Sequence, residues 1–211
     1  ARVNETLGKF FTPEHLRGLW LGARVRMDGN RLRVTQVEAN SPAAKAGLRT
    51  GDTVLEVNEK PVADFVEWAR ETAGRGKEKL SLKIFRGGRV VTTNLTLLQE
   101  EQVFNSKVIE ERLGLTVRTL TKDLAEQLGL SFYGGYLITK VAARGPGAEA
   151  GLEAGAVIQR VDDSQPQSLM AFARDIHGRE TNDPVRLSVV WEIRRGAFTQ
   201  RRSGVATVKA R

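Results

Sequence analysis

The sequence predicts a β-rich α+β protein in which one small domain occurs twice in tandem. The chain has 211 residues, about one and a half times a typical domain, so it has room for two small hydrophobic cores. Short alternating apolar runs follow one another between turns that contain glycine, a pattern typical of antiparallel strands. Residues 35–59 and 139–163 also match without gaps at a constant offset of 104 positions.

The two matched segments have identical residues at the proline and glycine positions beside the predicted helix and turn, and at several apolar positions. They read TQVEANSPAAKAGLRTGDTVLEVNE and TKVAARGPGAEAGLEAGAVIQRVDD. The shared residues are Val37 and Val141, Pro42 and Pro146, Ala46 and Ala150, Gly47 and Gly151, Leu48 and Leu152, Gly51 and Gly155, and Val57 and Val161. We infer that the domain has been duplicated.

The first elements follow the same order in each copy. A strand at 32–37 or 136–141 leads into a one-turn helix at 42–46 or 146–150, which has proline near its start and glycine after its end. A turn and a second alternating strand come next.

A longer amphipathic helix follows in each copy, at 63–73 and at 168–177. Its apolar face is spaced i, i+3, i+4, i+7 and consists of Phe65, Trp68, Ala69 and Thr72 in the first copy and Leu169, Phe172, Ala173 and Ile176 in the second. Each copy then closes with two alternating strands, which turn at Gly87-Gly88 and at Arg195-Gly196.

Each copy also opens with an apolar-glycine-apolar step, but the two steps are offset by only 92 positions. They read Leu21-Gly22-Ala23 and Leu113-Gly114-Leu115. The second copy therefore has 12 extra residues, and Leu124 and Leu128, one helical turn apart, predict an added short helix within 121–130.

Three segments lie outside the repeated elements. Residues 1–16 look like a piece of helix that ends before Pro13, and the polar residues 99–108 suit a linker. Residues 193–211 carry six basic side chains and no acidic one, which accounts for most of the net charge of +8. We expect a solvated basic hairpin there, the alternative being a patch for nucleic acid, anionic lipid or cell wall.

The composition excludes several classes of site. Without cysteine the chain has no disulfide, thiolate metal site or cysteine nucleophile. No apolar run is long enough to span a membrane, and the N-terminus lacks the pattern of an export signal. Only His15 and His177 could serve as a histidine base or ligand. We expect the chain itself to be non-catalytic and to use no cofactor or metal.

The segment SPAAKAGLRTGDTVLEVNEKPV is similar to the middle of a bacterial PDZ domain. Two such domains in tandem resemble the C-terminal half of an HtrA/Deg-family serine protease, and the resemblance covers about residues 17–211. It implies PDZ domains at 17–98 and 109–211, each a partly open barrel of five or six strands capped by two helices. It also implies that residues 1–16 are the remnant of the helix that closes a preceding protease domain.

The resemblance further implies a binding mode. The C-terminal or unfolded segment of a partner adds as a strand beside the strand that follows the glycine step, opposite the longer helix. Free backbone N–H groups of the glycine loop take the terminal carboxylate, because such nests bind anions.

The residues that the resemblance assigns to peptide binding fall in both copies. They are Arg17, Trp20, Leu21, Gly22, Ala23, Val25, Trp68 and Thr72 in the first copy, and Leu113, Gly114, Leu115, Val117, Phe172 and Ile176 in the second. Leu21, Gly22 and Ala23 form the first carboxylate loop, with Arg17 supporting it, and Trp68 and Thr72 wall its pocket.

Some residues depart from the family pattern. Ala23 stands where a larger aliphatic residue is usual, Arg112 replaces an apolar or aromatic residue, and Ala156 replaces the aspartate found at Asp52. An aromatic at helical spacing, such as Trp68 or Phe172, also suits plain core packing. We expect the first domain to be the peptide site.

The function implied is that of the substrate-recruiting and regulatory region of an exported serine endopeptidase for protein quality control. A non-catalytic PDZ adaptor, or the PDZ pair of a membrane-embedded metalloprotease, is the alternative. A nucleic-acid partner is not expected, because the basic excess is local.

Overall fold

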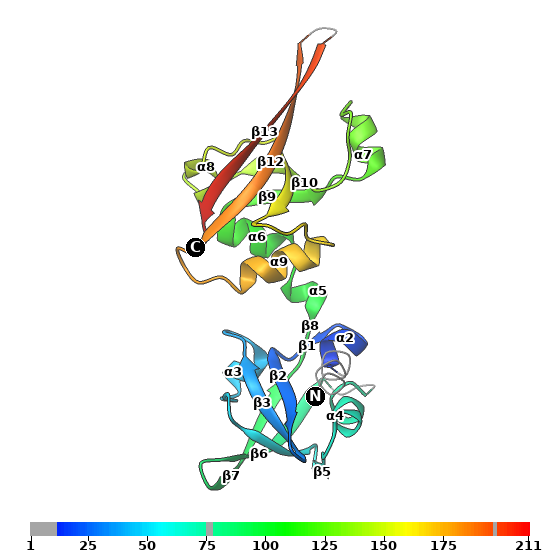
Figure 1. The fold of residues 1–211 in the computed structure, drawn as a ribbon, viewed down its shortest axis with the longest axis vertical. Coiled ribbons are helices and arrows are strands. Elements are labelled where there is room, and N and C mark those ends of the chain that lie inside the picture. Colours follow the sequence, from blue (N-terminus) through cyan, green and yellow to red (C-terminus); the bar gives the residue numbers. More distant parts are fainter. Residues whose placement is uncertain (1–11, 75–77, 196–197) are drawn as a thin grey trace. The chain divides into compact units, whose positions relative to one another are not determined.

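A computed structural model describes residues 12–74, 78–195 and 198–211 (Figure 1). The chain divides into two compact units, Ala1–Val103 and Phe104–Arg211. The expected helix over the first residues and the turn at Gly196 fall wholly or partly outside the described residues. The boundary between the units lies inside the segment that we expected to be a linker, 99–108.

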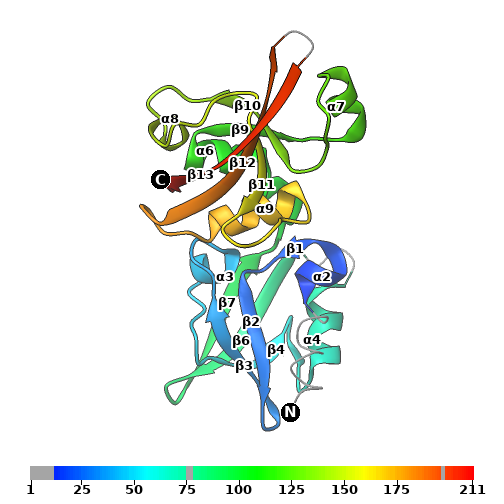
Figure 2. The ribbon, with the colours of Figure 1, turned by 45° about the horizontal axis from the view of Figure 1, so that its top comes forward.

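The first unit contains one main antiparallel sheet and a two-stranded ribbon. Its elements are α2 (Pro13–Arg17), β1 (Leu19–Trp20), β2 (Ala23–Asp28), β3 (Arg31–Val37), α3 (Pro42–Lys45), β4 (Thr53–Val57), β5 (Lys60–Pro61), α4 (Phe65–Thr72), β6 (Lys79–Arg86), β7 (Arg89–Thr96), β8 (Leu98–Gln99) and α5 (Glu100–Val103). The main sheet has the order β2-β3-β4-β6-β7, with β5 paired to β4, and β1 pairs with β8. In both views α3 and α4 lie on opposite sides of this sheet (Figure 1, Figure 2).

The second unit repeats this plan. Its elements are α6 (Ser106–Leu113), β9 (Leu115–Thr119), α7 (Lys122–Gln127), β10 (Tyr136–Val141), α8 (Pro146–Glu149), β11 (Val157–Val161), α9 (Leu169–His177), β12 (Pro184–Arg195) and β13 (Phe198–Lys209). Its sheet has the order β13-β12-β11-β10-β9, which is the first sheet's order with corresponding strands. The predicted fold class, β-rich α+β with two domains of one design, is confirmed, and both sheets are open.

Local sequence explains these elements. Leu80, Leu82 and Ile84 alternate along β6 and are 2%, 0% and 0% exposed, so one face of the strand packs into the core. Gly87 and Gly88 both have positive φ, 55° and 82°, as a two-residue hairpin turn requires. The longer helices begin at side-chain caps, because Asp64 and Ser168 accept hydrogen bonds from the N–H groups three residues on.

The insertion in the second copy forms helix α7. The Thr121 hydroxyl caps it by accepting the Leu124 N–H. Ala125 packs with Leu120, Leu137 and Val157 in a small cluster, so the insertion has its own patch of core.

The first described helix, α2, begins at Pro13, because proline is tolerated at the first helical position, where no N–H partner is needed. The helix that we expected to end before Pro13 lies outside the described residues. The 99–108 segment, which we expected to be a linker, contains α5 and the start of α6. Its charged residues lie on short helices, which polarity alone does not distinguish from a loop.

A buried ion pair in the first unit has no equivalent in the second. The Asp52 carboxylate, 1% exposed, accepts hydrogen bonds from Arg86 Nε and Nη2 at 2.6 and 2.7 Å and from the Arg49 N–H at 2.8 Å. The hydrogen bond to Asp52 raises the pKa of Arg86 above its ordinary value. Arg86 Nη2 also donates to the Gly47 carbonyl, which ties the end of β6 to the turn after α3.

The strand registers identify the residues that replace this pair. Thr53 pairs with Phe85 and Val157 pairs with Val190, so the positions of Asp52 and Arg86 correspond to Ala156 and Trp191. The second copy therefore has apolar residues at both positions, an exchange that buried ion pairs often tolerate.

We predict that Asp52→Ala lowers the free energy of unfolding of the first unit by about 2 kcal/mol, because it leaves the Arg86 guanidinium without its carboxylate. Asp52→Ala combined with Arg86→Leu is expected to recover most of this loss, since no unpaired charge remains. Urea denaturation followed by circular dichroism measures both variants. A double variant as unstable as the single one would contradict this account.

Candidate functional site

The first glycine loop joins β1 to β2 through Leu21 and Gly22. Gly22 has a φ of 73°, and a Cβ built there would lie 2.1 Å from Ser41 Cβ. The position therefore requires glycine for both its conformation and its packing. The Leu21 carbonyl accepts the Ala43 N–H at 3.0 Å, and the Gly22 carbonyl accepts the Glu38 N–H at 2.8 Å. With both carbonyls tied toward α3, the loop's N–H groups point the other way.

Those two N–H groups meet on a single acceptor. The backbone N–H groups of Leu21 and Gly22 donate to Glu14 Oε1 at 2.7 and 3.2 Å. Two consecutive N–H groups that converge on one oxygen form an anion-binding nest, and its occupant in this structure is a carboxylate.

Neighbouring side chains hold this arrangement in place. Arg17, at the end of α2, donates from Nη1 to the Gly74 carbonyl at 2.6 Å and so links α2 to the end of α4. Trp20 is 2% exposed and donates from Nε1 to Glu38 Oε2 at 2.9 Å. Arg17 thus holds α2, the helix that carries Glu14, and affects the loop only through that helix. Trp20 holds β1, the segment that leads into the loop.

Strand β2 is an edge of the main sheet and alternates buried and exposed residues. Ala23 and Val25 are 9% and 6% exposed, whereas Arg24 and Arg26 are exposed. Across from it on α4, Trp68 and Thr72 are 1% and 0% exposed, and Trp68 belongs to the main core of the unit. The residues expected to wall the first pocket are thus all on the inner face, and Trp68 also fills the core.

The second glycine loop is entered from a helix instead of a strand. Helix α6 runs to Leu113, and Gly114, with a φ of 69°, is its left-handed C-cap. The Gly114 N–H donates to the Glu110 carbonyl at 2.9 Å, while the Gly114 carbonyl accepts the Ala142 N–H as its counterpart does in the first copy. The second loop keeps the turn, but a main-chain carbonyl takes its glycine N–H group.

The second wall is also buried. Phe172 and Ile176 on α9 are 0% exposed, as are Leu113 and Leu115, and Val117 is 2% exposed. Helix α6 packs against both α9 and β9 (Figure 1). Helix α6 therefore lies close to both elements that would flank the implied groove.

Two more contacts fix this part of the second unit. The Tyr136 ring lies 5.2 Å from the Phe172 ring, and its hydroxyl donates to the Pro166 carbonyl at 3.0 Å. Burial raises the pKa of Tyr136, so it remains a donor. Arg112 donates from Nη2 to the Arg179 carbonyl just past α9, much as Arg17 does past α4.

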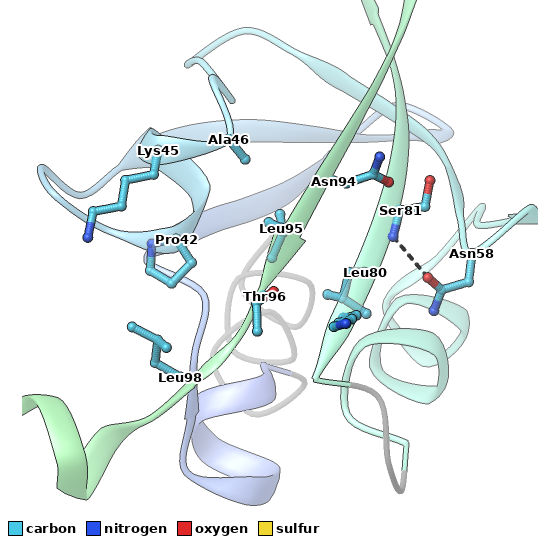
Figure 3. A pocket seen from close by; sticks show the side chains of 11 residues that line it. Pro42, Lys45, Ala46, Asn58, Leu80, Ser81, Asn94, Leu95, Thr96 and Leu98 are labelled. Atoms are coloured by element: carbon cyan, nitrogen blue, oxygen red, sulfur yellow. Dashed lines mark hydrogen bonds between the residues drawn. The ribbon is translucent and has the colours of Figure 1, made fainter.

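A cavity of about 650 Å³ lies elsewhere in the first unit (Figure 3). Its lining comes mainly from α3, β6 and β7 and is mostly apolar or neutral, and the exceptions are the charged residues Lys45 and Lys79. None of the predicted peptide-binding residues lines it, so the cavity is separate from the glycine loop.

His177 packs edge-on against Phe104 with the ring centroids 5.4 Å apart, which is a packing contact. Within residues 12–74, 78–195 and 198–211 there is no group of three metal-ligating side chains. The same residues contain no helix of the length and apolar character that crossing a membrane requires.

Glu14 is the site residue that the sequence analysis missed. The only sequence signal is a carboxylate placed by a proline at the start of a short helix, seven positions before Leu21. This signal does not distinguish it from an ordinary acidic residue in a first helical turn.

Comparison with known proteins identifies the first unit. The model of the PDZ domain family matches residues 20–97. The periplasmic serine endoprotease DegP of Salmonella typhimurium is 32% identical over 146 residues, which cover 68% of this chain and 28% of that protein. A probable periplasmic serine endoprotease, DegP-like, of Marinomonas sp. is 29% identical over 174 residues, covering 74% of this chain and 36% of that protein. The chain thus spans about a third of these relatives' length.

Solved structures resemble parts of the chain. The HtrA3 PDZ domain bound to a phage-derived ligand is 23% identical with a TM-score of 0.34, over 38% of this chain and 85% of that one. A serine endoprotease from Yersinia pestis is 26% identical with a TM-score of 0.33, over 38% of this chain and 29% of that one. The family match shows that residues 20–97 are a PDZ domain, the second unit repeats its strand order, and the chain is similar to part of the DegP-type serine endoproteases.

Proposed function

We propose that the chain is the substrate-recruiting and regulatory part of an exported serine endopeptidase, and that its first PDZ domain binds the free C-termini of polypeptides. The observation that carries this proposal is the nest at Leu21 and Gly22, which already holds a carboxylate oxygen. A terminal carboxylate offers the same group to the same donors. The named relatives favour a preceding protease domain and a periplasmic location over a free-standing adaptor.

The edge strand next to the nest supports the same mode. A peptide that continues from the nest along β2 would pair with the main chain of an edge strand, which is how extended peptides add to sheets. Its terminal side chain would face Ala23 and Val25, on the side where α4 lies.

The second domain is the weaker candidate for carboxylate binding. Its Gly114 N–H is part of the helix cap of α6, so a carboxylate would have to compete with a main-chain hydrogen bond. Helix α6 also packs against the helix and the strand between which a peptide would enter. We therefore assign peptide recruitment to the first domain.

Peptides with a free apolar C-terminus are expected to bind with a Kd on the order of 10 to 100 micromolar, as suits a short strand added to one edge. Amidation removes the carboxylate, and we predict that it weakens binding at least about tenfold, because a charged acceptor of two hydrogen bonds is lost. Isothermal titration calorimetry with paired free-acid and amidated peptides measures the difference. Equal affinities would refute carboxylate recognition.

The domain assignment is best tested without a substitution at Gly22, because a Cβ there would collide with Ser41 and damage the fold itself. We expect free-acid peptide to shift the amide NMR signals of Leu21, Gly22 and Ala23 at lower concentration than those of Leu113, Gly114 and Leu115. The opposite order would make the second domain the recruiter.

Arg24 and Arg26 predict that the domain prefers an acidic penultimate residue in the bound peptide. Because side chains alternate across a strand, the penultimate residue of an added peptide lies on the face where these arginines are exposed. A penultimate Glu is expected to bind about two to five times more tightly than Lys, the range of opposite-charge pairs across strands. Arg24→Glu should reverse the preference, whereas Arg89→Glu, at an exposed position on the far edge strand β7, should not. An unchanged preference in Arg24→Glu would place the peptide elsewhere.

A further inference from the structure

We propose that Glu14 is a built-in ligand of the first PDZ domain, which closes the carboxylate nest until α2 moves aside. The inference rests on the proposed function, because it concerns the same nest, and it adds regulation by a segment of the chain itself. Peptide binding is then a competition between the Glu14 side chain and a peptide C-terminus for the N–H groups of Leu21 and Gly22.

The geometry makes the two occupants exclusive. One oxygen of Glu14 already accepts both N–H groups, at 2.7 and 3.2 Å. A peptide carboxylate could reach these donors only by sitting within a few ångströms of the Glu14 carboxylate, where two like charges repel. Glu14 must therefore leave before the peptide terminus can bind in the nest.

Helix α2, which carries Glu14, is attached in a way that permits release. It has five residues, a single turn, and helices of this length are not stable without tertiary contacts. Leu16 on the same turn is 48% exposed. Gly18 follows the helix with a φ of 60° and nothing within 4 Å of where a Cβ would stand, so this glycine can act as a pivot. Such short elements belong to the part of a fold that opens at low cost in free energy.

Side-chain contacts also define the closed state. Arg17 joins α2 to the Gly74 carbonyl, so the segment that blocks the nest is linked to α4, the helix opposite β2. Pro13 is buried, which anchors the start of the turn. A peptide that pushes between β2 and α4 would therefore disturb the same contacts that hold Glu14 in place.

In the second domain the equivalent glycine loop is closed by a main-chain group instead of a side chain. Its loop N–H is taken by the Glu110 carbonyl, a main-chain group of an eight-residue helix that packs on α9 and β9. Opening that loop requires the last turn of α6 to unwind. In the first domain the same donor is taken by a side chain, which can rotate away and return.

The effect on affinity follows from the fraction of molecules whose nest is open. The apparent Kd for peptide is the intrinsic Kd divided by that fraction, so a closure that is occupied about nine-tenths of the time weakens binding about tenfold. Removing the side chain in Glu14→Ala makes the nest permanently open.

The experiment compares wild type, Glu14→Ala, Glu14→Gln and the control Glu111→Ala. Glu111 is an exposed carboxylate on α6, three residues before Gly114, whose side chain pairs with Lys107 and does not touch either loop. We expect Glu14→Ala to bind free-acid peptides about tenfold more tightly than wild type, Glu14→Gln to lie between them because it keeps a neutral acceptor, and Glu111→Ala to equal wild type. The gain should vanish with amidated peptides.

Amide NMR of the unliganded variants separates this inference from the proposed function. Loss of a charged acceptor should move the Leu21 and Gly22 N–H signals upfield in Glu14→Ala and leave those of Leu113 and Gly114 in place. Unmoved Leu21 and Gly22 signals, or equal free-acid affinities of wild type and Glu14→Ala, overturn the inference. Moved signals without any carboxylate-dependent binding support Glu14 as the occupant and refute only the peptide-binding proposal.

Discussion

The loop at Gly22 depends on a close approach between its backbone and Ser41. No Cβ fits there, because it would lie 2.1 Å from Ser41 Cβ. The Ser41 hydroxyl in turn accepts the Ala44 N–H to cap α3 and donates to the Glu38 carbonyl at 2.7 Å. One contact therefore positions the start of β2, the end of β3 and the beginning of α3. The N–H groups of Leu21 and Gly22, which form the nest, are left on the side away from this contact.

The second copy has the equivalent close approach, between Gly114 and Gly145. Gly145 stands where the first copy has Ser41, and a Cβ at Gly114 would lie 3.3 Å from the Gly145 Cα. Gly145 provides no side-chain cap for α8, so the second loop loses one of its hydrogen bonds. Helix α6 compensates, because it delivers Gly114 as its own C-cap and supplies the acceptor for its N–H.

The two domains thus share a fold and differ in what occupies equivalent positions. Asp52 and Arg86 join two strands by charge, where Ala156 and Trp191 are apolar. A side-chain carboxylate fills the first nest, where a helix carbonyl fills the second. These differences are consistent with the proposal that the first domain recruits peptides and the second does not.

The sequence by itself determined the duplicated plan and the order along the chain of the repeated strands and of the short and long helices, because these follow from local periodicity, capping residues and glycine turns that recur at one offset. It also indicated the two glycine loops. Only the tertiary structure decided what the loops hold. Glu14 reaches the nest because α2 and β1 turn the chain back on itself, and burial of Trp68 and Phe172 depends on packing between segments about fifty residues apart. Contacts between segments so far apart in sequence depend on tertiary packing, because residue periodicity indicates only which face of a helix or strand is buried.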